Sequence, residues 1–171
     1  KREPKVFSTP ISLPWRNDRA NYFNVVAITD ATGQRPTGFF CRGSESPNTR
    51  ELLRDLGFEY ACNAFDDDLP YYHHFADGQD PLLILPYALD CNDMKYFHPN
   101  GFVTADDFIR YVCDGVGVLL AEGEHGYPKM LNIGLHLRIS GRPSRFAAVA
   151  GILEFLCGLG DDVWIATRQE I

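Results

Sequence analysis

One stretch decides the fold that we predict for this chain, and it runs Met130-Leu131-Asn132-Ile133-Gly134-Leu135-His136-Leu137-Arg138-Ile139-Ser140-Gly141-Arg142-Pro143. It begins as an apolar run of strand length, carries a histidine at its far end and turns through Ser-Gly-Arg-Pro into a new helix. In α/β folds functional groups collect at the carboxyl ends of strands, because the loops there vary while the strands hold them rigidly. His136 is therefore expected to be a general acid, a metal ligand or a hydrogen-bonded core residue.

Helical and strand patterns alternate on either side of this stretch. Apolar runs predict strands near residues 36–41, 58–62, 82–85, 130–137 and 163–167. Helices are predicted to begin near Asn17, at Ser46-Pro47, at Thr104 with its capping partner Asp107, and at Pro143. Alternation at these spacings indicates βαβ units and a mainly parallel sheet, either open or part of a barrel.

The composition narrows the class of protein. The chain has 171 residues, of which 45% are hydrophobic and 13% aromatic, and this suits one soluble globular domain. Its formal charge of -7 disfavours binding to a phosphate backbone, so no nucleic-acid partner is expected. No apolar run approaches the ~20 residues that a membrane-spanning helix needs, so no membrane span is expected.

The five cysteines are widely spaced and form no CxxC pair. This pattern indicates neither a disulfide framework nor a zinc knuckle and favours a reducing, intracellular compartment. We expect the cytoplasm, or an organelle matrix if the lack of an initial methionine reflects removal of a presequence.

Polar residues follow several of the predicted strands. Asp66, Asp67 and Asp68 form one acidic cluster, and Asp90 with Asp93 forms another. Such aspartates either cap and solvate loops or point carboxylates into a pocket, where they orient a histidine or bind a polar substrate. Arg42 lies between a strand and a helix start, a place suited to fixing a carboxylate or an oxyanion.

Other histidines and glycines do not form a recognisable cofactor site. The adjacent pair His73-His74 points to opposite sides of an extended segment and is a poor chelate for one ion. The glycines of Gly115-Val116-Gly117 lie inside a helical pattern, whereas a dinucleotide fingerprint needs its first glycine after a strand. We therefore predict no metal and no other cofactor.

Several segments, taken in order, resemble one known family. They are Pro36–Phe40, Ser46–Arg50, Asp66–Tyr71, Pro86–Met94, Ala121–Gly123, Pro128–Met130, Ile133–Arg138 and Gly141–Pro143. From about Gly33 to the end they resemble the C-terminal half of the polysaccharide-deacetylase superfamily (NodB-homology type), and within it the allantoinase-like branch. The resemblance implies an α/β fold that is a partial (β/α) barrel, with about five mainly parallel strands and helices on the outside. It also implies hydrolysis of C–N bonds in amides or cyclic ureides.

The resemblance assigns roles to matching positions. His136 would protonate the leaving nitrogen, Asp90 and Asp93 would line and tune that site, and Arg42 would orient carboxylates. Substrate binding would fall to the loop that contains Asp66, Asp67, Asp68 and Tyr71.

The chain also departs from the family pattern. The family's catalytic aspartate and its His-xxx-His metal ligands have no counterpart before Gly33, where Phe7 to Trp15 reads Phe-Ser-Thr-Pro-Ile-Ser-Leu-Pro-Trp. The chain is also shorter, by roughly 80 to 100 residues, than a closed barrel of about 250 residues. We therefore expect an extended arm over residues 1–16 and an incomplete deacetylase-like domain over residues 17–171. Another protein chain, in a hetero- or homo-oligomer, would cover its open side.

These expectations lead to one main hypothesis and two alternatives. The main hypothesis is a truncated, catalytically degenerate pseudoenzyme that is inactive alone and acts as a structural or accessory subunit of a larger assembly. The first alternative is the C-terminal half of an active amide or ureide hydrolase whose base lies on a missing segment or a partner chain. The second is a small-ligand binding module around His136, Asp90 and Arg42.

Overall fold

A computed structural model describes residues 16–43 and 45–171 of the chain. Residues 1–15 of the predicted arm, and with them the segment Phe7 to Trp15, lie outside this description. The elements in chain order are α1 (Arg16–Thr32), β1 (Gly38–Phe39), α2 (Thr49–Asp55), β2 (Tyr60–Ala61), β3 (Tyr71–His73), β4 (Leu82–Ile84), the 3-10 helix η1 (Asp93–Phe97), α3 (Ala105–Glu124), α4 (Leu137–Ser140), α5 (Pro143–Gly158) and the 3-10 helix η2 (Gly160–Asp162).

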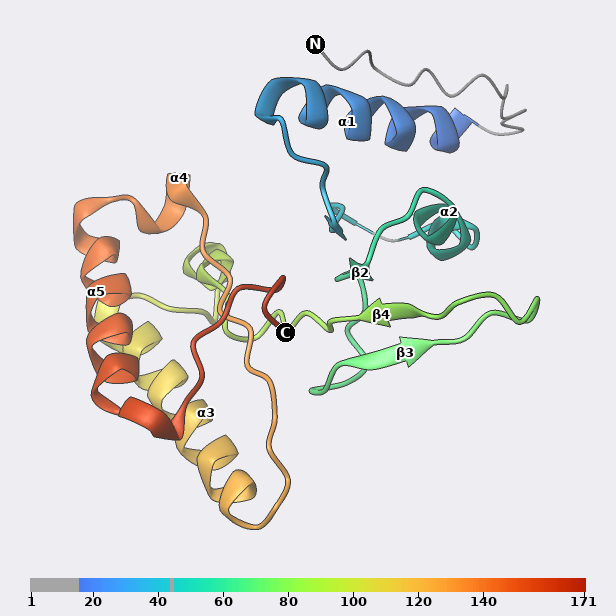
Figure 1. Cartoon of the computed structure of the whole chain (residues 1–171). Helices are drawn as coiled ribbons and strands as arrows, with labels where there is room; N and C mark the ends of the chain where they lie inside the picture. The colour runs from blue at the N-terminus through green and yellow to red at the C-terminus, as the bar shows by residue number, and fades with distance from the viewer. Residues whose placement is uncertain (1–15, 44) are drawn as a thin grey trace.

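The described strands form one open sheet in the order β1-β2-β4-β3 (Figure 1). β1 pairs with β2, and β2 with β4, in parallel, whereas β3 runs antiparallel to β4. The predicted α/β class and the strands at residues 36–41, 58–62 and 82–85 are confirmed, although each observed strand is shorter. The described residues contain four strands rather than about five, and β3 forms where the sequence predicted only a loop.

The strand predicted at residues 130–137 is wrong. The segment is extended but makes only two backbone anchors, from the Met130 N–H to the Asp68 carbonyl at 2.9 Å and through a parallel bridge between Asn92 and Gly134. A ladder does not continue beyond the bridge, because the neighbouring chain enters η1 at Asp93 and offers no further extended backbone.

The strand predicted at residues 163–167 is also wrong. The segment pairs with none of the four described strands, so its apolar pattern alone does not produce a ladder. The segment crosses the molecule as irregular backbone and places Trp164 and Ile165 at the surface.

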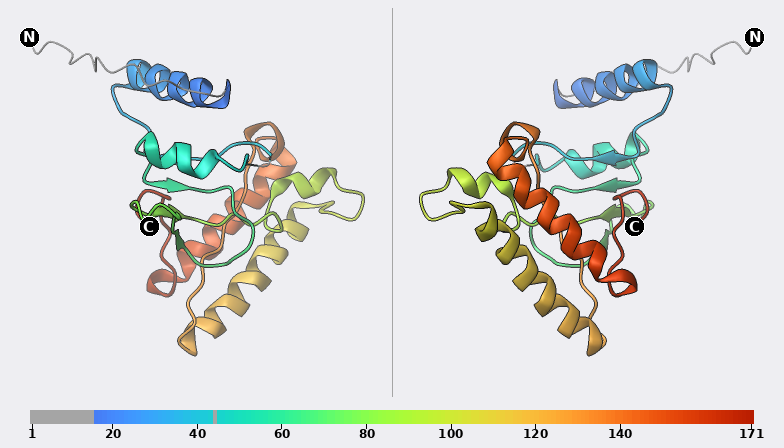
Figure 2. Two further views of the ribbon diagram at one scale, coloured as in Figure 1. Left: turned by 90° about the vertical axis from the view of Figure 1, so that its right-hand side faces the viewer. Right: turned by 90° about the vertical axis from the view of Figure 1, so that its left-hand side faces the viewer.

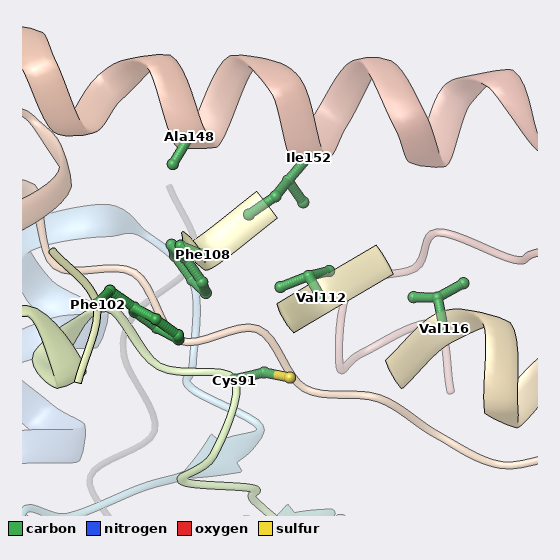
Figure 3. Close-up of a cluster of buried hydrophobic side chains, with 7 residues drawn as sticks. All are labelled: Cys91, Phe102, Phe108, Val112, Val116, Ala148 and Ile152. Atoms are coloured by element: carbon green, nitrogen blue, oxygen red, sulfur yellow. The ribbon is translucent and has the colours of Figure 1, made fainter. Parts of the chain in front are cut away.

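Helices α3 and α5 pack side by side and contribute most of the first core (Figure 3). α3 begins as predicted, because the Thr104 hydroxyl accepts a bond from the Asp107 N–H and the Asp107 carboxylate accepts one from the Thr104 N–H at 2.7 Å. These bonds lower the pKa of Asp107. The core side chains, several of them aromatic, are Cys91, Phe102, Phe108, Val112, Val116, Ala148 and Ile152.

A second core lies between the sheet and α2. It consists of buried side chains from α2, from both central strands and from the segments that follow α2 and β2: Leu53, Phe58, Ala61, Ala64, Leu82 and Ile84. α1 lies outside α2 in Figure 2 and contributes Val25 at the edge of this core. The functional region described below lies where the chain passes from the second core to the first.

Membrane insertion has no support in the helices of residues 16–43 and 45–171, none of which combines the length and the apolar character that a bilayer crossing demands.

The aromatic centre of the first core gives a stability prediction. Phe108 is fully buried and its ring stacks on Phe102 with 4.8 Å between centroids. We expect Phe108→Ala to lower the free energy of unfolding by about 3–5 kcal/mol in denaturant titrations, because it removes apolar contacts and leaves a cavity. Val103→Ala is the matched control, since that side chain is 87% exposed and its loss should cost less than about 0.5 kcal/mol. Equal costs for the two variants would contradict this account of the core.

Candidate functional site

The carboxylate of Asp93 is fully buried and accepts three hydrogen bonds. One oxygen, Oδ2, accepts from the backbone N–H of His136 at 2.7 Å and from the Ser140 hydroxyl at 2.6 Å. The other, Oδ1, lies 2.7 Å from Nδ1 of the His136 ring. Asp93 opens η1, whereas His136 caps α4 and Ser140 ends it, so one carboxylate joins two segments more than 40 residues apart. A buried polar group with this many partners is satisfied without water.

The bridge at Gly134 brings these groups together. The Asp93 N–H donates to the Gly134 carbonyl at 3.0 Å, and the Gly134 N–H donates to the Cys91 carbonyl at 2.8 Å. Asn92 supports the junction, since its side chain accepts from the Met94 N–H at 2.9 Å and donates to the Tyr87 hydroxyl at 2.8 Å. A Cβ at position 134 would collide with the Asn92 amide and the Tyr87 hydroxyl, so only glycine permits this approach.

The bond to Asp93 fixes the state of the His136 ring. A carboxylate only accepts hydrogen bonds, so Nδ1 carries a proton and Nε2 holds the lone pair of the neutral ring. Among the described residues no partner bonds Nε2, and 28% of the side chain is exposed. A ring held by a buried carboxylate on one side and accessible on the other is suited to proton transfer through Nε2.

Two further predicted site residues, Asp90 and Arg42, form no hydrogen bond with this pair in the described residues. Asp90 is exposed and its carboxylate lies 3.9 Å from the Cys91 sulfur. Arg42 is exposed, and within residues 16–43 and 45–171 it forms no ion pair. Neither residue is therefore joined to His136 by a hydrogen bond in the described structure.

The predicted substrate loop is exposed but connected to the segment that leads to His136. Asp66 accepts a bond from the Tyr71 hydroxyl at 3.1 Å, and Asp67 accepts the N–H groups of the two residues that follow it. The Asp68 carbonyl accepts the Met130 N–H at 2.9 Å. The carboxylates of Asp66 and Asp67 thus stabilise the loop itself, while its backbone is fixed to the opening of the 130–143 stretch.

Sequence reasoning missed several residues that build the site. Ser140 donates to Asp93 and follows His136 by four residues, which is about one helical turn. This spacing could have indicated that the two side chains lie on the same side of a helix. Tyr87 and Asn92 carried no recognisable signal, because their roles depend on a bridge between distant segments. Apart from this site, Arg50 pairs with Glu45 at 3.0 Å and lies 3.2 Å from the His73 ring. Those three residues line a surface hollow of about 410 Å³.

Four of the five cysteines do not resemble activated nucleophiles. All five lie within the described residues and are free thiols. Burial raises the pKa of Cys91 to about 11, and burial also raises the pKa values of Cys41, Cys62 and Cys113. A nucleophilic cysteine needs a lowered pKa, so thiolate chemistry is disfavoured at these four positions.

A metal site is not formed by the described residues alone, since no three His, Cys, Asp or Glu side chains among them gather closely enough to hold an ion.

Comparisons with known proteins show which proteins this chain is similar to. No protein-family model matches it. A protein of Schizosaccharomyces pombe (strain 972) whose name assigns it to the polysaccharide deacetylases is 40% identical over 142 residues, which cover 75% of this chain and 44% of that protein. The solved structure of Puue allantoinase matches with a TM-score of 0.81 at 40% identity, over 90% of this chain and 50% of that one. A Pseudomonas aeruginosa PAO1 structure assigned as a polysaccharide deacetylase gives a TM-score of 0.80 at 39% identity, with the same two coverages.

These matches confirm the resemblance to the polysaccharide-deacetylase superfamily, with allantoinase among its members. The mixed α/β fold is similar to that of the deacetylase barrel proteins. The chain spans about half the length of the relatives it matches.

The buried carboxylate gives the first prediction for the site. Asp93→Asn replaces two acceptor oxygens by one and turns an amide N–H₂ toward groups that are themselves donors. We expect the free energy of unfolding to fall by about 3 kcal/mol in denaturant titrations. The control, Asp90→Asn, changes an exposed side chain three residues away and should cost less than about 0.5 kcal/mol. A similar small cost for both variants would show that the three bonds do not hold the site together.

The close approach at Gly134 gives a second prediction. Gly134→Ala should lower the free energy of unfolding by about 1–3 kcal/mol, because the added methyl group overpacks the contact with Asn92 and Tyr87. Gly117→Ala on α3 is the control, since a Cβ there meets no other atom and alanine should stabilise the helix by about 0.5–1 kcal/mol. The two substitutions should therefore change the melting temperature in opposite directions, and a shared direction would contradict the assignment.

Proposed function

We propose that this chain, a relative of the polysaccharide deacetylases over about half of their length, supplies the proton donor of a hydrolase that cleaves non-peptide C–N bonds. The observation that carries the proposal is the His136 ring, bonded through Nδ1 to the fully buried Asp93 carboxylate and partly exposed at its other side. The same pair occurs in a fold similar to those of allantoinase and of proteins assigned as deacetylases.

The geometry suits the second half of amide or ureide hydrolysis. In the first half, water adds through its oxygen to the acyl carbon and gives up a proton to a general base. In the second half the C–N bond breaks, its electron pair moves to nitrogen, and the nitrogen takes the proton from Nε2 of His136. Asp93 stabilises the imidazolium before this transfer and fixes the ring in the productive tautomer.

The general base must come from another part of the assembly. Asp93 is fully buried and is engaged by three donors, so it does not face a water molecule that attacks substrate. We place the base on a segment of the relatives' length that this chain does not span, whether in the same protein or in a partner chain. General base catalysis contributes about 10²- to 10⁴-fold, so this chain alone should turn over very slowly.

An apolar surface beside the site supports such a partner segment. Phe40 and Phe65, each 53% exposed, follow β1 and β2 and contact Tyr87, with ring centroids 5.1 and 6.1 Å apart. Exposed aromatic clusters of this kind mark surfaces that are covered in the working protein. In this proposal the missing half covers the cluster, and Tyr87 connects it to the site through Asn92.

A second candidate function is a non-catalytic accessory domain. The observation that favours it is that His136 has no general base beside it. Among the described residues, Asp93 is the one acidic side chain bonded to His136, and its carboxylate is already engaged. In that case the pair would serve only to join η1 to α4. Substrate binding without turnover would instead favour a small-ligand module in which Asp66, Asp67, Asp68, Tyr71, Asp90 and Arg42 contact the ligand.

Turnover with a matched histidine control tests the proposal. The native protein, with any chain that co-purifies, is assayed on allantoin and on an N-acetylglucosamine oligomer. We expect hydrolysis of one of them, and we expect His136→Ala to lower kcat by at least about 100-fold because the leaving nitrogen loses its proton donor. His98→Ala is the control, since His98 is exposed and lies outside the site.

Two results would contradict the proposal. Turnover that survives His136→Ala would remove the proton-donor role from this residue. A native assembly that hydrolyses neither substrate, although it is folded and complete, would favour the accessory domain.

A further inference from the structure

Helix α5 is apolar on two opposite sides. One side, with Ala148 and Ile152, packs against α3 in the first core (Figure 3). The other side lies at the molecular surface (Figure 2, right) and carries an exposed stripe, the α5 stripe, at intervals of four, three and four positions: Phe146, Ala150, Leu153 and Cys157. Its two large side chains, at positions 146 and 153, are 57% and 51% exposed. A helix that is apolar on all sides is normally buried on all sides, so we expect the α5 stripe to be covered.

The two ends of α5 carry charges of opposite sign. Arg142 is the N-cap residue and Arg145 lies in the first turn, whereas Glu154 lies near the C-terminal end and Asp161 follows it in η2. Within residues 16–43 and 45–171 none of the four forms an ion pair, although the Arg145 guanidinium lies over two aromatic rings of η1. The helix dipole favours acidic residues at the N-terminal end and basic residues at the C-terminal end. These charges therefore do not stabilise α5 by itself.

We propose that a second copy of this chain covers the α5 stripe, with the two α5 helices antiparallel about a two-fold axis. In such a pair, a contact between residues i and j is matched by one between j and i. The spacing of the stripe reads the same from both ends, so Phe146 of one copy faces Cys157 of the other. Ala150 faces Leu153 in the same way. Each contact joins a large and a small side chain, which lets the two helices interdigitate.

Charge complementarity selects a second copy in this orientation. Antiparallel helices place the basic end of one α5, at Arg142, beside the acidic end of the other, where Glu154 and Asp161 lie. A parallel pair would bring like charges together at both ends. Charges that are unfavourable in the single helix thus become favourable in the pair. The proposal is independent of hydrolysis and of the partner segment placed at Phe40 and Phe65.

Sedimentation equilibrium tests the pairing. One stripe spans about 17 Å at 1.5 Å per residue, and such a small interface gives a reversible dimer with a Kd on the order of 10 μM. The native protein, with any chain that co-purifies, should therefore contain two copies of this chain per particle at high concentration. We expect Leu153→Glu to raise the Kd at least about 10-fold, because it buries a charge in the stripe. Val118→Glu is the control, since that side chain is 59% exposed on α3 and should leave the Kd unchanged.

Disulfide formation tests the antiparallel orientation. Phe146→Cys places a thiol opposite Cys157 of the other copy, so a mild oxidant such as diamide should link the two copies covalently. Adding Cys157→Ala should abolish this link in an antiparallel pair, whereas a parallel pair would still be linked through position 146. The native protein should not be linked, because its Cys157 faces a phenylalanine.

Three results would overturn the inference. The first is a native particle that holds one copy of this chain at every concentration. The second is a Kd that Leu153→Glu leaves unchanged. The third is the release of a different co-purified chain by Leu153→Glu, because that chain, rather than a second copy, would then cover the α5 stripe. None of these results depends on whether the protein turns over a substrate.

Discussion

A fully buried carboxylate, Asp93, is the group on which the rest of the site depends. Removing such a charge from water costs several kcal/mol, and the cost is offset only when every strong acceptor position finds a donor. Here the donors are a backbone N–H and a ring nitrogen of His136 and the hydroxyl of Ser140. Two of the three donors belong to His136. The bonds that satisfy the buried carboxylate during folding therefore also orient the histidine ring.

The carboxylate also joins the two halves of the described structure. The sheet with α2 forms one core, and the pair α3 and α5 forms the other. The chain passes between them through Cys91, which is buried in the first core beside α3 and α5, and then through Asn92 and Asp93. The stretch from Met130 to Pro143 returns across the same junction, and the Gly134 bridge sets its register. A site at the boundary of two rigid cores positions its histidine without needing a regular strand beneath it.

Much of the local structure could be predicted from sequence, because it depends on local chemistry. The capping box at Thr104 and the proline in the first turn of α5 define helix starts whatever surrounds them. Local chemistry could not decide whether residues 130–137 and 163–167 form strands, since a strand exists only where a neighbouring strand pairs with it. The pairing of His136 with Asp93 was implied only by a family resemblance, and Ser140 was missed because its partner lies 47 residues away in sequence.

The central claim is that Asp93 holds the His136 ring with its proton on Nδ1, so that Nε2 is the nitrogen that exchanges protons with substrate. Long-range ¹H–¹⁵N correlation spectra of the native protein, recorded at a pH where the ring is neutral, measure this tautomer directly. The account predicts that Nδ1 of His136 shows the shift of a protonated nitrogen and Nε2 that of an unprotonated one. A proton found on Nε2 in the neutral ring would contradict it, because Nδ1 would then face the Asp93 carboxylate as a second acceptor.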